Sequence, residues 1–141
     1  MKHINSERGQ SLVELAISIV ILVYLLAGAV EFGLAFFQFV QLRDAAQEGA
    51  LYGSMNPLDP TNIELRVRNA STSPVNLLDT SKVTVTQTII GAPCEGNGIE
   101  VRVSFNHQIF MPFIPQFIGS STIPLNATVT DTILSPTCVG P

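Results

Sequence analysis

The chain has 141 residues and a mass of 15.2 kDa, which leaves room for one small folded domain and excludes large multidomain enzymes. Charged residues make up only 13% of it, about half the share of a typical soluble domain, while hydrophobic residues make up 46%. Seven basic against 11 acidic residues give a net charge of -4, so we expect no nucleic-acid partner. The shortage of charge predicts that part of the chain lies in a non-aqueous environment.

The apolar residues concentrate in residues 12–42. Residues 15–30 carry no charge, and with a few flanking positions they reach the ~20 residues that a helix needs to cross a ~30 Å hydrocarbon core. A secretory signal peptide has an apolar region of only about 7 to 15 residues, which ends at a cleavage site of small residues. Here the apolar run is longer, and the small residues within it are followed by more helix-compatible sequence instead of a polar mature start. We therefore interpret the run as a membrane-spanning helix surrounded by lipid.

The charges that flank this run predict its orientation. Lys2 and Arg8 precede it, whereas Arg43 follows beside Asp44 and Glu48. Because basic residues accumulate on the cytoplasmic side, we expect a cytoplasmic N-terminus and an exported C-terminal part.

The apolar run is also longer than a membrane span requires. Its 31 residues would measure about 46 Å as a helix, against a core of ~30 Å, and tilt absorbs some of the excess. Residues 32–42 are apolar around most of the helix, so outside lipid they need protein on several sides. A packed bundle of like helices would supply that cover.

The front of the run carries a short motif in which Glu14 follows Gly9 by five residues. It resembles the type IV prepilin signature, which implies that a prepilin peptidase removes residues 1–9 by cutting between Gly9 and Gln10. Glu14 would then be the fifth residue of the mature chain, and in that family this carboxylate pairs with the terminal ammonium of a neighbouring subunit. Gln10 departs from the Phe or Met usual at the first mature position, so N-terminal methylation is not implied.

Two carboxylates of the run are candidates for roles in assembly. Glu14 either takes part in assembly or recognition, or is a solvated carboxylate at the cytoplasmic edge. Glu31 lies about 25 Å further along the helix, close to the outer interface, where it is either wetted or makes an interhelical contact. The distance excludes the two as a catalytic pair.

The helix is expected to continue beyond the membrane until Gly53 and Pro57 stop it. Small residues recur every fourth position at Ala45, Gly49 and Gly53. Such a stripe permits close backbone approach. We expect it to pack on the protein's own sheet or, alternatively, on another subunit.

The order of these segments is similar to the TadE-like family of tight-adherence (Flp/Tad) pilus systems. The matching segments are SLVEL at residues 11–15, AVEFG at residues 29–33 and DAAQEGALYG at residues 44–53. The resemblance implies a membrane-inserted pseudopilin, processed by the prepilin peptidase, that works with other pilin or pseudopilin subunits and the inner-membrane platform of the pilus system. Because major Flp pilins are little more than the helix, the additional domain favours a minor pseudopilin.

We divide the chain into the leader (residues 1–9), the pilin-like helix (residues 10–54) and an exported α+β domain (residues 55–141). The domain should contain a short helix at residues 61–70 that begins with a capping box of Thr61 and Glu64. Alternating patterns predict strands at 82–90 and 99–105, joined as a hairpin, and a third strand lies within 121–133, giving a three-stranded antiparallel sheet.

Two features of the exported domain leave alternatives open. The apolar loop at residues 111–118 either folds over the sheet, presents a patch for adhesion or partner binding, or dips into the outer surface of the membrane. Cys94 and Cys138 form a disulfide if the compartment is oxidising, or otherwise remain free thiols.

Enzymatic activity is not expected, and neither is a cofactor or metal. The exported part has one histidine, His107, its cysteines lack metal-site spacing, and no phosphate-binding glycine pattern occurs. Our leading hypothesis is a minor pseudopilin of a tight-adherence pilus, in the bacterial inner membrane, with its C-terminal domain in the periplasm or on the cell surface in a pilus. The alternatives are an uncleaved periplasmic scaffold and a small surface adhesin on the same anchor.

Overall fold

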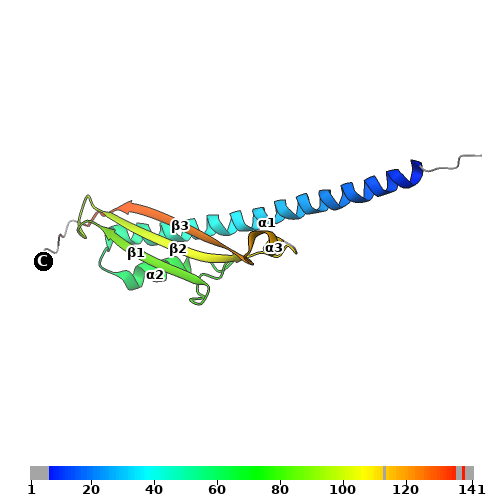
Figure 1. Cartoon of the computed structure of the whole chain (residues 1–141). Coiled ribbons are helices and arrows are strands. Elements are labelled where there is room, and N and C mark those ends of the chain that lie inside the picture. The colour runs from blue at the N-terminus through cyan, green and yellow to red at the C-terminus, as the bar shows by residue number, and fades with distance from the viewer. Residues whose placement is uncertain (1–6, 113, 136–137, 139–141) are drawn as a thin grey trace, which may run out of the picture.

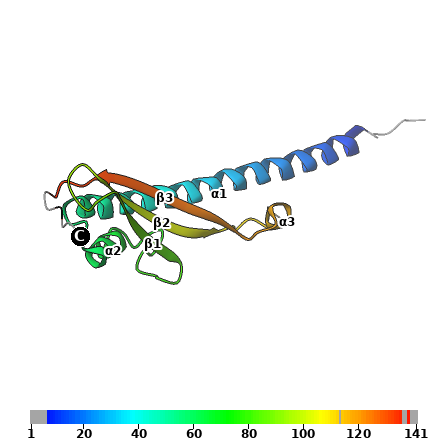
Figure 2. The ribbon, with the colours of Figure 1, turned by 60° about the vertical axis from the view of Figure 1, so that its left-hand side comes forward.

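The computed structural model describes residues 7–112, 114–135 and 138, and it consists of one long helix with a small domain at its C-terminal end. The elements in chain order are α1 (Glu7–Met55), α2 (Pro60–Asn69), β1 (Val83–Ile90), β2 (Gly98–Gln108), α3 (Ile114–Ile118) and β3 (Thr122–Thr132). The N-terminal half of α1 projects away from the domain, and its C-terminal half lies along the sheet (Figures 1 and 2). The expected α+β fold is confirmed.

The sheet has the strand order β1-β2-β3, and both neighbouring pairs are antiparallel. Ile89 pairs with Ile99 near the hairpin turn, and Val103 pairs with Ala127 in the middle of the sheet. The turn uses positive φ angles at Gly91 and Gly96, which glycine adopts without steric cost. The predicted hairpin is therefore confirmed, with β2 extending three residues beyond the predicted strand, to Gln108.

One face of the sheet packs on α1 and α2, and this layer forms the core. The alternation along β2 turns Ile99, Val101 and Val103 towards the helices, where all three are fully buried. The helices supply mostly small or branched apolar residues to the same layer: Leu42, Ala45, Ala46, Ala50, Ile63 and Val67. The opposite face is exposed and polar, so α1 serves both as the projecting rod and as part of the domain's core.

The helix α2 begins where a proline and an aspartate favour it, one residue earlier than predicted. The side chain of Asp59 caps it by accepting a hydrogen bond from the backbone N–H of Asn62, and Pro60 occupies the first turn. The expected capping box starting at Thr61 is therefore wrong, because Thr61 already lies inside the helix. Hydrogen bonds from Asn62, through its side chain and then its backbone, hold the pKa of Asp59 below its ordinary value.

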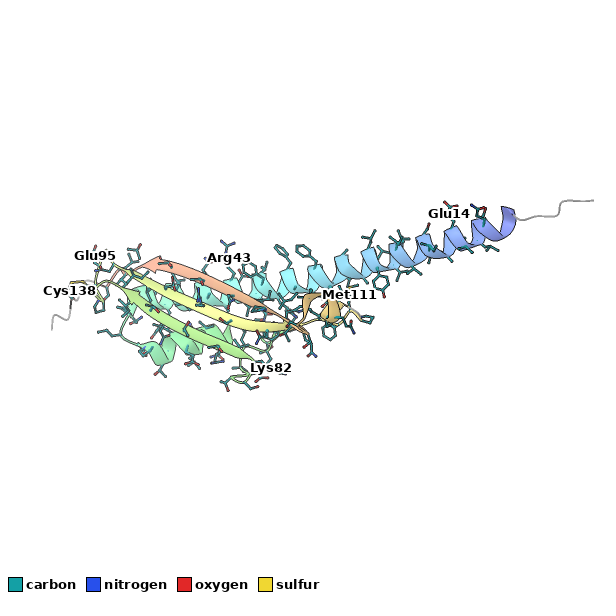
Figure 3. All side chains as sticks on the ribbon, viewed as in Figure 1. Glu14, Arg43, Lys82, Glu95, Met111 and Cys138 are labelled. Carbon is teal, nitrogen blue, oxygen red and sulfur yellow. A yellow bond between two sulfur atoms is a disulfide. The ribbon has the colours of Figure 1, made fainter. Side chains whose placement is uncertain are left out.

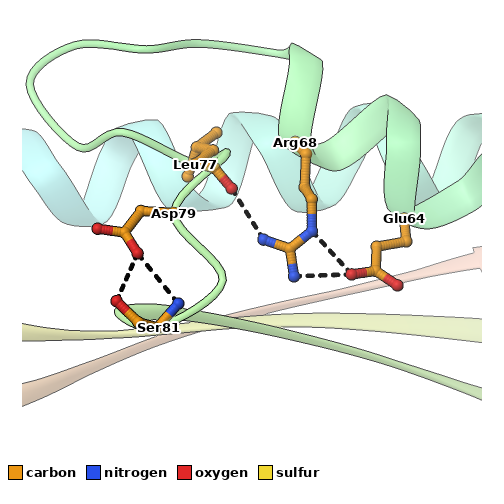
Figure 4. A network of polar contacts seen from close by, with 5 residues as sticks. All are labelled: Glu64, Arg68, Leu77, Asp79 and Ser81. Carbon is orange, nitrogen blue, oxygen red and sulfur yellow. Dashed lines mark hydrogen bonds and ion pairs between the residues drawn. The ribbon is translucent and has the colours of Figure 1, made fainter.

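A small polar network ties α2 to the segment that leads into β1 (Figure 4). Arg68 donates through Nε to Oε1 of Glu64 at 2.7 Å, and through Nη1 to the carbonyl of Leu77 at 2.9 Å. Asp79 accepts from the hydroxyl of Ser81 at 2.6 Å and from its N–H at 3.0 Å, which turns the chain into β1. Leu77 is fully buried, so the network fixes this connection against the core.

Candidate functional site

The N-terminal part of α1 is exposed and apolar along its length. The segment Gly9–Met55 has the length and composition of a membrane-crossing helix, and its most apolar window has a mean hydropathy of 2.5 with no residue buried. Leucine, isoleucine and valine side chains from Leu12 to Leu26 are half or more exposed. Exposed apolar surface of this extent is costly in water, so the segment acts as a membrane anchor.

The predicted processing site lies at the start of this helix. Gly9 and Gln10 fall in the first turn of α1, and both are exposed. Glu14 lies one turn further along and is also exposed, far from the sheet domain (Figure 3). Cleavage at Gly9 and the assembly role of Glu14 remain predictions, and the other leader residues before Glu7 lie outside the described part of the chain.

At the other end of the exposed segment, Glu31 contacts the sheet domain. Its Oε1 atom lies 2.9 Å from Nε2 of His107 and accepts a hydrogen bond from the backbone N–H of Phe110 at 3.1 Å. His107 comes from β2, is fully buried, and places Nδ1 2.7 Å from Oε1 of Gln38 on α1. Two polar residues of α1 therefore hold the membrane-proximal end of the sheet.

This cluster satisfies the buried histidine at both nitrogens. With Nε2–H donating to Glu31, Gln38 pairs with Nδ1 through its oxygen when the ring is doubly protonated, or through its NH2 group when the ring is neutral. Only 13% of the Glu31 side chain is exposed. Glu31 thus makes an intramolecular contact that we did not anticipate, while its role in subunit assembly remains a prediction.

The protein's own domain covers one side of the apolar residues 32–42 of α1. Leu42 is fully buried in the core and Phe39 packs against it, so one side of residues 32–42 is already covered. Phe32, Phe36 and Phe37 nevertheless remain 72%, 57% and 62% exposed. We expected this segment to need protein on several sides. The chain's own domain covers the side that faces the sheet, and the other side stays exposed.

The stripe of small residues packs inside the domain. Ala45, Gly49 and Gly53 are all buried, and a Cβ atom at Gly49 would overlap Cγ2 of Val67 and lie 3.3 Å from Cγ1 of Val101. At Gly53 the nearest atom would be Cδ1 of Ile99, at 2.6 Å. Of the two alternatives, the structure places α2 and β2 of the same chain on this stripe, and the approach is closest at Gly49.

Cys94 and Cys138 form a disulfide at the end of the domain far from the exposed helix (Figure 3). It joins the β1–β2 turn to the segment after β3, with a sequence separation of 44 residues and a Cα–Cα distance of 4.7 Å. Closing a loop of this size contributes on the order of 4 kcal/mol in the chain-entropy account. The N–H of Gly96 also donates a hydrogen bond to the carbonyl of Ile133 at this end of the sheet. The disulfide therefore reinforces a connection that the backbone already makes.

The described residues contain no group of three or more metal-ligating side chains. The surface that stands out is therefore the helix itself, together with its contact at Glu31.

Comparison with known families agrees with the resemblance found in the motifs. The family model described as TadE-like protein matches residues 9–51, less than a third of the chain. Neither the curated proteins nor the solved structures give a match. The matched residues include the exposed segment, Glu14, Glu31 and Gly49. The chain is thus TadE-like over residues 9–51, the segment that supplies both the membrane anchor and most of the helix surface on which its domain folds.

Proposed function

We propose that this protein is a minor pseudopilin that takes part in assembly of a tight-adherence pilus. The TadE-like match over residues 9–51 ties the chain to such pilus systems. The observation that carries the more specific role is the open apolar side of α1. Phe36 and Phe37 are exposed beyond the length of helix that a ~30 Å hydrocarbon core covers, so they need a protein surface.

Helices of the same kind suit this surface. Between Leu15 and Phe37 the exposed residues of α1 are apolar except for Ser18, and a second pilin-like helix can lie along this part without disturbing the sheet domain. In this arrangement the peptidase removes the leader after Gly9, and the freed ammonium at Gln10 lies near the Glu14 carboxylate of a neighbouring subunit. The C-terminal domain then faces the periplasm or the exterior of the pilus.

Charge at Glu14 is the element of this mechanism that can be tested most simply. In cells with the pilus system, Glu14→Ala and Glu14→Gln should both be cleaved yet be lost from the sheared-fibre fraction while remaining in the membrane fraction. The isosteric glutamine variant separates loss of charge from loss of bulk. Glu95→Gln removes an exposed carboxylate at the far end of the domain and should behave as the wild type.

The mass of the purified protein's N-terminus distinguishes this role from that of an uncleaved scaffold. A mass beginning at Gln10 supports the pseudopilin, whereas retention of residues 1–9 at normal peptidase levels would contradict it. Normal piliation in the Glu14→Gln variant would contradict the proposed role of the Glu14 charge in assembly.

A further inference from the structure

A second apolar surface lies beside the point where α1 leaves the membrane. It consists of the segment between β2 and β3, which includes α3, and which projects from the end of the sheet nearest the exposed half of α1 (Figures 1 and 2). We propose that this segment inserts its apolar side chains into the outer leaflet of the membrane that α1 crosses, as an interfacial anchor. The proposal rests on α1 as a membrane anchor and does not require incorporation into a pilus.

The depth of the segment follows from its contacts with α1. Counted from Leu12, Glu31 lies about 28 Å along the helix, which is the outer boundary of a ~30 Å core. The N–H of Phe110 is bound to Glu31, which places Phe110 at that level. An apolar hollow between the segment and α1 is lined by Gly28 and Phe32 of the helix and by Ile114 and Ile118 of α3. The segment therefore lies at the outer boundary of the hydrocarbon core, and its contact with Gly28 lies inside that boundary.

Chemistry of the segment suits lipid better than water. Between Arg102 and Asp131 the chain has no Asp, Glu, Lys or Arg. Ile109 and Met111 are buried, each 8% exposed, so they hold the segment to the protein. Phe110 and Ile118 are largely exposed instead, at 73% and 57%, and Ile118 also lines the hollow beside α1. Phenylalanine and other large apolar side chains form the face that interfacial segments bury at the boundary between headgroups and acyl chains.

A backbone hydrogen bond joins the two ends of the segment, so its exposed side chains are held in a defined position. The N–H of Ile109 donates to the carbonyl of Ser121 at 3.0 Å, and the N–H of Gly119 donates to the carbonyl of Pro115 at 2.9 Å. Phe32 on α1 is 72% exposed at the same level. The outward side of the segment is thus continuous with the lipid-facing surface of α1, and this continuity favours lipid as its occupant over a separate protein partner.

The absence of tryptophan from the sequence allows a direct test. Single tryptophans are introduced into the full chain as Phe110→Trp, Ile118→Trp, Leu22→Trp and Leu58→Trp, all at exposed positions, so folding is preserved. Each variant is reconstituted at high lipid-to-protein ratio into phosphatidylcholine–phosphatidylglycerol vesicles with or without brominated acyl chains. Leu22 reports on the membrane-spanning part of α1, and Leu58 lies at the opposite end of the domain.

Insertion predicts blue-shifted emission and a loss of emission in brominated vesicles for Phe110→Trp and Ile118→Trp, as for Leu22→Trp, with Leu58→Trp unaffected. Unquenched, red-shifted emission at both positions would overturn the proposal. Blue-shifted emission that bromine does not quench would also overturn it, because a protein surface, such as a second copy, would then cover the segment. If Leu22→Trp is quenched in either case, α1 is still a membrane anchor. The insertion of the segment can therefore fail while the proposed function stands.

Discussion

The close approach at Gly49 makes a quantitative prediction about how the domain holds α1. In Gly49→Ala the new methyl group overlaps Cγ2 of Val67, with Val101 behind it at 3.3 Å. Valine on a helix has one strongly preferred rotamer, so Val67 cannot turn away cheaply. Overpacking of this kind costs about 1–3 kcal/mol, and the better helix propensity of alanine returns about 1 kcal/mol. We expect a net loss of up to about 2 kcal/mol in the free energy of unfolding.

Gly53→Ala is the matched control, because it makes the same chemical change in the same helix. Its nearest neighbours are the Cδ1 ends of Ile99 and Ile63, at 2.6 and 3.2 Å, and these ends can rotate aside. The overlap is therefore relieved, and we expect Gly53→Ala to be close to neutral.

Urea unfolding in detergent micelles measures this difference through tyrosine fluorescence. Tyr52 donates a hydrogen bond to Asp59 and changes environment when the domain unfolds, whereas Tyr24 lies in the exposed, membrane-spanning part of α1. The account expects a lower midpoint for Gly49→Ala than for Gly53→Ala at unchanged slope. A Gly49→Ala midpoint equal to or above that of Gly53→Ala would refute the reasoning that close packing requires glycine at this position.

Two further predictions concern the polar contacts of the domain. His107→Leu should lower the free energy of unfolding by about 1–3 kcal/mol, because it leaves Glu31 and Gln38 without their buried partner. In a double-mutant cycle with Glu31→Gln, a coupling above about 0.5 kcal/mol is expected, and a coupling near zero would contradict the contact. Since folding lowers the pKa of Asp59, the stability it contributes is present above its unfolded-state value near 3.8 and is lost as pH falls through the lower folded value. The free energy of unfolding, measured below pH ~4, should show this loss of stability in the wild type and not in Asp59→Asn. The same pH profile in both proteins would exclude Asp59 as the source of the loss.

Much of the fold follows from local patterns in the sequence. The uncharged run predicts the membrane helix, alternation predicts β1 and β2, and the glycine-rich turn predicts the hairpin, because each signal depends on neighbours within a few residues. The start of α2 shows the limit of such signals. Thr61 and Glu64 match a capping box, yet Asp59 before Pro60 competes successfully, since proline favours the first helical position.

The contact between Glu31 and His107 could not be predicted from spacing, since 76 residues separate them. A weaker signal was present in the sequence. Glu31 is the one charged residue between Glu14 and Arg43, and His107 is the one histidine outside the leader. Isolated polar residues in apolar segments usually have a partner, because burying them alone is costly. The partner of the small-residue stripe was likewise open until the fold placed Val67 and Val101 on it.

The central claim is that the open side of α1 packs on other pilin-like helices, and photo-crosslinking in cells tests it most directly. A photoreactive phenylalanine analogue replaces Phe37, which is 62% exposed beyond the membrane-spanning segment, and in a control it replaces Thr86, on the exposed face of β1. The account predicts adducts with other pilin-like subunits from position 37 and none from position 86. Adducts from position 37 with lipid alone, or none in cells that assemble pili, would contradict it.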